Sequence, residues 1–219
     1  MHHHVYRTAA ALALVGATAL AVTACGGSGA EPSGKSDKIA GADAGKPKAA
    51  PSTKADPVAG RPKIVLPEDV RNVFEDGPTG DPAKDAVLAD SERRVNSVDA
   101  AITIGGKTGE AVTFYSSGDA LITATNYITS FYKDGKTFTG TTRFYDREVT
   151  SLKGTAAEVT YCLDASKTYP KDRKTQKVSH PAGSPSDYVH YRTGLRKNAK
   201  GVWQTVTVQS TEGAKQCMP

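Results

Sequence analysis

The spacing of apolar residues changes at Lys136, and this change limits the folds that the chain can adopt. Before this residue, apolar side chains recur with the spacing of amphipathic helices. After it, apolar and polar residues alternate, which is typical of strands with one buried face. Helices followed by strands predict an α+β fold, in which N-terminal helices pack on a curved antiparallel sheet of about four strands.

The region before Lys136 contains the start and stop signals of several helices. A short helix is expected over 67–74, where a proline and two acidic residues suit a first turn. A longer helix is expected from the N-cap Asp81 to Gly105. Residues 105–109 are expected to form a plain turn, and a third helix is expected within 116–135, closed by a glycine.

Strands are expected in the second half wherever the two-residue period holds. The segments are 138–149, 157–163, 189–195 and 202–208. In the last of them, the alternation places Val202 and Val206 on one face and Trp203 on the other. Residues 169–186 are polar and contain prolines, which predicts an extended loop between two strands.

Residues 1–24 have the features of a lipoprotein signal peptide. Arg7 precedes an apolar run over 9–21, and small residues of a lipobox stand directly before Cys25. The run is shorter than the roughly 20 residues that cross a bilayer. Cleavage before Cys25 would leave a thiol for a diacylglycerol anchor of the palmitate class. This anchor predicts a location on the extracytoplasmic face of the cell membrane; an ordinary secretory signal, cut at an Ala-x-Ala site, is the alternative.

The rest of the chain divides into a tether and a domain. Residues 25–60 are rich in Gly, Ala, Ser, Pro and Lys and contain almost no large apolar side chain, so they predict a disordered linker. As a flexible chain, this linker would reach about 30 Å from the membrane. Residues 61–219 have the length of one ordinary domain.

A basic loop is the clearest charged feature of a chain whose formal net charge is +5. Its cationic residues are Lys171, Arg173, Lys174 and Lys177. They predict contact with an anionic surface, either lipid head groups or an envelope polymer. The alternative is a solvated hairpin whose lysines prevent edge pairing. A location outside the cell argues against nucleic acid as a partner.

Two cysteines remain once Cys25 carries the lipid. Outside the membrane, such a pair commonly forms a disulfide, so Cys162 and Cys217 are expected to be joined. Two separate buried thiols are one alternative. A redox-active pair is another, although the sequence lacks a Cys-x-x-Cys site.

Helices before Lys136 and a run of antiparallel strands after it resemble the nuclear transport factor 2-like, or cystatin-like, cone-shaped fold. Five segments, 22–25, 80–88, 114–118, 159–162 and 195–203, carry a further resemblance. Through them the chain is similar to small secreted actinobacterial lipoproteins built on that fold, a group without an assigned activity. The resemblance implies helices packed on a curved sheet. The wider fold hosts isomerases, dehydratases, binding modules and interaction modules, so it does not determine a function.

The resemblance also implies where catalytic groups would lie, because enzymes of this fold place an ionisable side chain inside the cone. His190, paired with Asp146 or Asp164, is the best acid–base candidate. The alternative places His190 on a solvated face beside Arg192. The sequence has no metal-ligand spacing, no Gly-x-Ser-x-Gly motif and no complete phosphate-binding loop. No metal and no cofactor are therefore expected.

Two functional hypotheses follow. In the first, a membrane-anchored lipoprotein acts as a non-enzymatic binding or interaction module. Its concave sheet face would bind a protein, an envelope polymer or a small apolar ligand. In the second, the domain is a small isomerase or dehydratase with a base inside the cone. Sheets of this fold often dimerise face to face, so an exposed patch around Trp203 would predict a homodimer.

Overall fold

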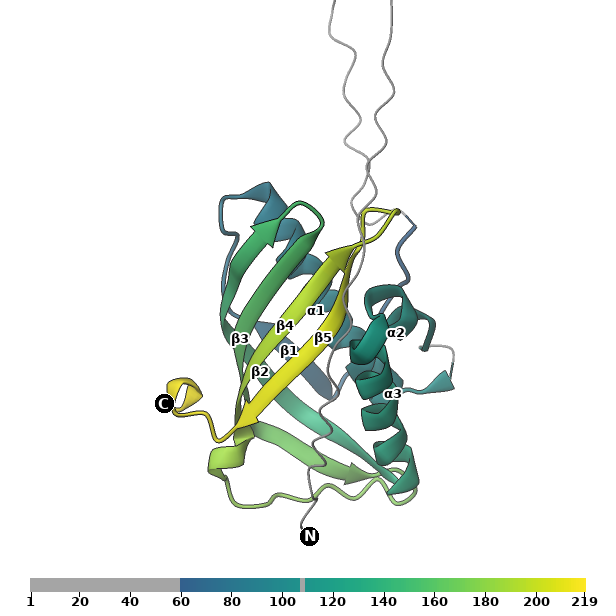
Figure 1. Cartoon of the computed structure of the whole chain (residues 1–219). Helices are drawn as coiled ribbons and strands as arrows, with labels where there is room; N and C mark the ends of the chain where they lie inside the picture. The colour runs from purple at the N-terminus through teal and green to yellow at the C-terminus, as the bar shows by residue number, and fades with distance from the viewer. Residues whose placement is uncertain (1–59, 107–108) are drawn as a thin grey trace, which may run out of the picture. The chain divides into compact units, whose positions relative to one another are not determined.

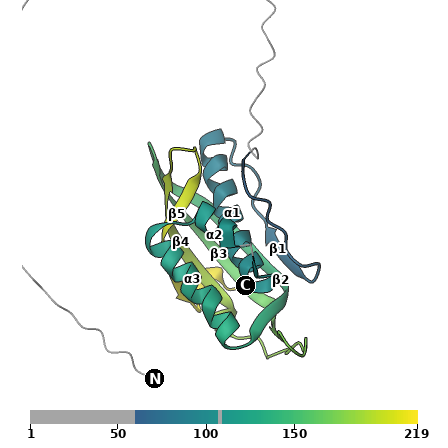
Figure 2. The same cartoon turned by 90° about the vertical axis from the view of Figure 1, so that its right-hand side faces the viewer.

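A sheet of five strands, in the order β1-β2-β3-β4-β5, organises the described part of the chain, residues 60–106 and 109–219 (Figure 1). The strands are β1 (Val70–Phe74), β2 (Lys136–Lys153), β3 (Ala156–Asp172), β4 (Tyr188–Lys197) and β5 (Trp203–Glu212). β1 pairs with β2 in parallel, and the other neighbours pair antiparallel. The helices lie together on one side of the sheet (Figure 2). The expected α+β architecture is confirmed.

The predicted signal peptide, the anchor Cys25 and all of the predicted linker except Gly60 lie outside the described residues. Lys107 and Thr108 lie outside them as well. Within the described part, no helix is both long enough and apolar enough to cross a bilayer.

The helix expected over 67–74 is wrong, because this segment forms a turn followed by β1. Val70 donates a backbone hydrogen bond of 3.0 Å to Pro67, which closes the turn. Val70 is paired with Gly140 of β2 and is buried. Phe74 stacks on Phe144, with 4.7 Å between ring centroids. An isolated helix of this length is marginal, so pairing and stacking with a distant strand decide the outcome.

The two longer helices are confirmed. α1 spans Pro82–Thr103, and the Asp81 carboxylate accepts a hydrogen bond of 2.8 Å from the backbone of Ala83, as an N-cap does. α3 spans Gly118–Lys133. A third helix, α2 (Gly109–Tyr115), lies directly after the expected turn. With seven residues, α2 is too short to show a helical period in the sequence.

The strands β2 and β3 are longer than expected, and β3 continues to Asp172 inside the segment that was expected to be a loop. Two irregular positions bend β2. Gly140 has a φ of 104°, and a Cβ atom there would lie 2.2 Å from the carbonyl oxygen of Lys167. Asp146 has a φ of 51° beside a register shift, which marks a β-bulge. Bulges increase curvature, so these positions help to curve the sheet around α1.

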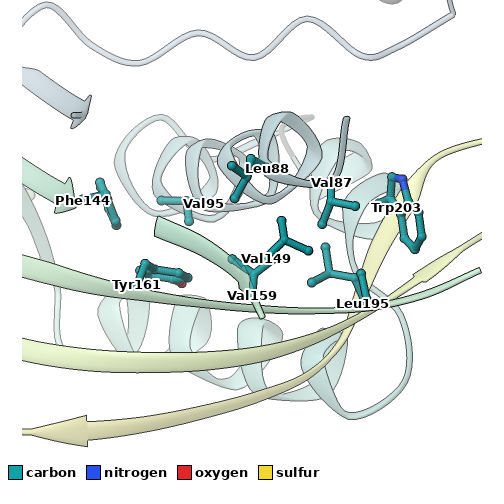
Figure 3. Close-up of a cluster of buried hydrophobic side chains, with 10 residues drawn as sticks. Val87, Leu88, Val95, Phe144, Val149, Val159, Tyr161, Leu195 and Trp203 are labelled. Atoms are coloured by element: carbon teal, nitrogen blue, oxygen red, sulfur yellow. The ribbon is translucent and has the colours of Figure 1, made fainter. Parts of the chain in front are cut away.

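The main core lies between α1 and the sheet (Figure 3). Its buried members are Val87, Leu88, Val95, Phe144, Val149, Ala157, Val159, Tyr161, Leu195 and Trp203. Trp203 is only 3% exposed, so it is part of the core and not of an exposed patch. The register shift between Gly194 and Leu195 changes which residues of the hairpin face inward. A second cluster around Ile102 and Ala124 joins α1, α2 and α3.

A disulfide joins Cys162 of β3 to Cys217 in the short 3-10 helix η3 (Lys215–Cys217), as expected. Both cysteines are buried, together with Ala214, in a small cluster. Tyr145 packs against this cluster, and its hydroxyl donates to the carbonyl oxygen of Cys217. The cluster lies on the outer face of the sheet, which is the face opposite the helices, because Tyr161 next to Cys162 points into the core. The bond therefore fixes the C-terminal tail to the outer face.

Candidate ligand-binding site

The three acid–base candidates from the sequence do not form a site inside the cone. His190 is half-buried on the outer face, opposite Cys162 in the β3–β4 register. Asp146 is exposed at the bulge of β2. Asp164 is buried, on the same outer face, and forms an ion pair of 2.9 Å with Arg143. No hydrogen bond joins these three candidates to one another within residues 60–106 and 109–219.

The carboxyl of Asp164 is held in its ionised form. Burial by itself would raise its pKa, but hydrogen bonds from Ser166 and Arg143 outweigh burial and lower the pKa. Glu75 also binds Arg143, at 2.6 Å, so the arginine connects two carboxylates. A permanently ionised, paired carboxylate suits a structural ion pair on the outer face, because a general base near neutral pH needs a higher pKa.

The four cations of the basic loop have different surroundings. Lys171 forms an ion pair of 2.9 Å with Asp69. The guanidinium of Arg173 lies 3.9 Å from the ring centroid of Tyr132. Only Lys174 and Lys177 are exposed. The loop therefore does not present its four charges as one continuous patch.

Polar side chains also lie on the buried face of α1, where the apolar stripe predicted only core contacts. Asp90 is 1% exposed and is fully engaged. It forms ion pairs with Arg61 and with Arg93, and it accepts a backbone hydrogen bond of 2.9 Å from Trp203. Asp90 thus connects the segment before β1, the helix α1 and the start of β5.

Arg94, one turn further along α1, is buried but lacks such partners. Its exposure is 9%, and its Nε atom has no hydrogen-bond partner. Within the described part of the chain it forms no salt bridge. A buried N–H donor without a partner costs about 1–3 kcal/mol, and the charge of Arg94 acts on the nearby Asp99 without a salt bridge between them. This arginine therefore stands out among the buried polar groups of the helix.

Aromatic rings form a row across the inner face of the sheet. Phe144 stacks on Phe74 at 4.7 Å and meets the edge of Tyr161 at 6.1 Å. Tyr161 in turn stacks on its cross-strand neighbour Tyr191, with 5.0 Å between centroids. The row starts in the core at Phe144, which is 2% exposed, and ends at the half-buried Tyr191. This row lies close enough to Arg94 for its charge to act on both tyrosines.

Asp99 is the ionisable group with the most altered titration in this region. Burial raises the pKa of its carboxyl to about 6, against the opposing effects of a hydrogen bond from Asn72 and the charge of Arg94. The Asn72 amide donates to the Asp99 carboxylate at 2.6 Å. Burial also raises the pKa values of the tyrosines Tyr161 and Tyr191. Both phenols therefore remain protonated and can donate hydrogen bonds at neutral pH.

We call the residues Arg94, Asp99, Tyr127, Tyr161 and Tyr191 the inner site. Tyr127 comes from α3, and burial of its phenol raises its pKa, with further contributions from Tyr191 and Asp99. Its side chain marks the outward end of the site, because the residue is 53% exposed whereas Tyr161 is 5% exposed. The inner site therefore runs from a buried cation to an accessible tyrosine. Chemically, it combines a positive charge, phenol donors and aromatic rings.

The sequence did not predict the inner site. Arg94 and Asp99 lie within a helix that was assigned from its apolar stripe, and the polar residues beside that stripe were not considered as a site. A signal was present, since Asp90, Arg94 and Ser97 recur at helical spacing beside that stripe. Within the described residues, no group of three His, Cys, Asp or Glu side chains could hold a metal ion.

Comparisons with known proteins give only distant similarities. No family model matches the chain, and no curated protein matches it. One similar solved structure is a ketosteroid isomerase-like protein from Erwinia carotovora atroseptica, with 15% identity and a TM-score of 0.40 over 60% of this chain and 97% of that one. Another is the intermembrane space region of the chloroplast protein ARC6, with 13% identity and a TM-score of 0.43 over 62% and 99%. A third, from Catenulispora acidiphila, has 12% identity and a TM-score of 0.39 over 58% and 91%. Similarity at this level carries no inference about function.

Proposed function

We propose that this chain is a membrane-anchored extracytoplasmic lipoprotein whose domain binds a small organic anion at the inner site without changing it chemically. The observation that carries the binding proposal is Arg94, a buried guanidinium with an unsatisfied Nε atom. The anchor rests on the lipobox before Cys25.

A ligand anion would supply the hydrogen-bond acceptor that the Nε atom of Arg94 lacks. A guanidinium binds a carboxylate or sulfonate through parallel, charge-assisted hydrogen bonds, which are stronger than bonds between neutral groups. Asp90, on the same helix, is already engaged by two arginines and a backbone amide, so it cannot serve this purpose. The neighbouring Asp99 is drawn toward Asn72. An external anion would therefore bind the Arg94 guanidinium more strongly than water does.

The rest of the ligand would be flat and largely apolar. The half-buried ring of Tyr191, which stacks on Tyr161, would offer its edge and remaining surface to an aromatic or conjugated body. Tyr127, the exposed end of the inner site, would cover the outer part of the ligand. The sequence left a protein, a polymer and a small apolar molecule open as ligands. The proposal names one class, a small molecule with an aromatic body and an anionic group.

The test uses two fluorescent probes that differ in charge. Anilinonaphthalene sulfonate carries an anionic group, and N-phenylnaphthylamine has the same ring system without it. We expect the full chain to bind the sulfonate more tightly. Arg94→Met should weaken sulfonate binding by about tenfold or more, because a charged hydrogen bond is lost. The same substitution should leave binding of the neutral probe unchanged.

Two controls separate the inner site from general charge effects. Arg71→Met removes one positive charge from an exposed position of β1 and should change neither probe. Arg94→Lys keeps the charge but loses the planar fork, so it should have an intermediate affinity. Equal sulfonate binding by the wild type and Arg94→Met would refute the proposed binding function. Membrane anchoring is tested separately, since Cys25→Ser should release the protein into the medium.

A second candidate function is proton transfer, with Asp99 as the base in place of His190. The observation in its favour is the Asp99 pKa of about 6, beside phenols that could stabilise an enolate. An enzyme of this kind would exchange the α-protons of an enolisable ketone with solvent deuterium, and Asp99→Asn would abolish the exchange. If no ketone of such a panel exchanges its α-protons, the catalytic function is excluded and only the binding function remains.

A further inference from the structure

A polar hollow of about 240 Å³ lies at the end of the sheet where β2 begins and β3 ends, and none of the inner-site residues lines it. Its wall includes Thr137, Lys171, Arg173 and Asp69, and Pro67 and Phe138 add apolar surface. Thr137 and Lys171 face each other in the β2–β3 register. The hollow therefore brings residues from both strands together with the turn before β1.

Thr137 is an unusual member of this wall. Its exposure is 7%, and its Oγ1 atom has no hydrogen-bond partner. A buried hydroxyl that bonds to nothing is unfavourable, and replacing that hydroxyl by a second methyl, as in valine, would remove this cost. By contrast, the hydroxyl of Thr139, two residues along the same strand, bonds to the Asp69 carbonyl oxygen at 2.6 Å.

Two cations border the same space, and both are held in place. Lys171 is oriented by its ion pair of 2.9 Å with the Asp69 carboxylate. Arg173 stacks on Tyr132 and donates from one terminal nitrogen to the Ile102 carbonyl oxygen at the end of α1. The Nε atom of Arg173 remains buried without a partner. With Asp69 counted, the hollow carries one net positive charge and two unsatisfied donors.

We propose that this hollow binds a phosphate group, either free or as part of a lipid head group. A tetrahedral oxyanion has enough acceptor oxygens to bind the Thr137 hydroxyl, the Arg173 Nε–H and the Lys171 ammonium at the same time. The volume exceeds that of bare phosphate, so an ester substituent fits beside Pro67 and Phe138. Asp69 keeps its place behind Lys171, where it orients the ammonium. The exposed Lys174 and Lys177 lie outside this site.

The experiment measures the thermal unfolding of the full chain in inorganic phosphate against chloride at matched ionic strength. Phosphate should raise the unfolding temperature of the wild type, because a ligand that binds the folded state stabilises it. Thr137→Val replaces the hydroxyl by a methyl group of similar size, and it should reduce phosphate affinity about tenfold without lowering stability in chloride. Lys171→Met should also reduce affinity. The matched control Lys174→Met removes the same charge from outside the hollow and should behave like the wild type.

A second arm identifies the source of the phosphate. The same variants are mixed with phosphatidylcholine vesicles that do or do not contain phosphatidylglycerol, and co-sedimentation is measured. Binding to phosphatidylglycerol that is lost in Thr137→Val but kept in Lys174→Met assigns the site to lipid head groups. A response to inorganic phosphate alone, with the same dependence on Thr137, assigns it to a soluble phosphate. Equal losses in Lys171→Met and Lys174→Met, or no response in either arm, would overturn the proposal. The inner-site probes are independent of all these results.

Discussion

Removal of the disulfide should destabilise the domain by an amount that follows from the chain it encloses. Cys162 and Cys217 are 55 residues apart. In the chain-entropy model, a closed loop of this length lowers the entropy of the unfolded chain enough to stabilise the folded state by about 4 kcal/mol. Both cysteines are buried, and the double variant Cys162→Ala/Cys217→Ala replaces them by small apolar side chains. Most of the effect should therefore arise in the unfolded state.

The assay is urea unfolding of the full chain, followed by tryptophan fluorescence. Trp203 is the only tryptophan in the sequence, and it is buried in the main core, so its emission reports on the domain. We expect a loss of about 4 kcal/mol in the free energy of unfolding and a fall of about 10 °C in the unfolding temperature. The emission of the folded double variant should match that of the wild type.

The control variant Tyr145→Phe separates the covalent bond from its surroundings. It keeps the disulfide but removes the hydrogen bond to the Cys217 carbonyl oxygen, and it should cost about 1 kcal/mol. The reasoning would be refuted if the double variant lost no more free energy than Tyr145→Phe. A changed emission of the folded state would also refute it, because the loss would then come from the folded structure.

Two further predictions concern the carboxylates of Asp90 and Asp99 on α1. Asp90→Asn should lower the free energy of unfolding by about 3 kcal/mol, because it breaks a buried ion pair, and urea unfolding would measure this; a loss as small as that of an exposed pair would show that Asp90 does not connect its neighbours. The pKa of Asp99 is raised to about 6 in the folded state, so the folded state holds a proton that the unfolded state has already released between about pH 4 and pH 6. Stability should therefore fall by roughly 2–3 kcal/mol as the pH rises through this window, and Asp99→Asn should remove that slope; an unchanged slope would assign it to another group.

The sequence predicted the elements whose hydrophobic period is long and regular. The helix after Asp81 and the four antiparallel strands are present, because each buries one face against the same core. The strand β1 was not predicted, because the strand that it pairs with, β2, lies far along the sequence. Val70 and Phe74 become a strand through contacts with β2, and the proline and acidic residues before them form a turn. A local pattern cannot report such a pairing.

Side-chain direction was less predictable than the presence of a strand. Simple alternation along 202–208 places Thr205 and Thr207 on the same face as Trp203, yet Trp203 and Thr205 are buried whereas Thr207 is exposed. The register shift at Gly194 and Leu195 adds a residue to one strand of the hairpin and so breaks the alternation that the prediction assumed. The predicted acid–base residues show the same difficulty. His190 and Asp164 were assigned only from the alternation of residues along a strand, and both lie on the outer face.

The contrast between Asp90 and Arg94 explains why the inner site is a better candidate for function than other buried polar groups. Both side chains lie on the inward face of α1, one turn apart, and both are buried. Asp90 has two arginines and a backbone amide, which is sufficient to explain its burial by structure alone. Arg94 has an unsatisfied donor and lies beside rings that extend to the surface through Tyr191. An apolar residue would pack in this position without an unsatisfied donor, so the presence of Arg94 supports the proposal that an anion binds from outside.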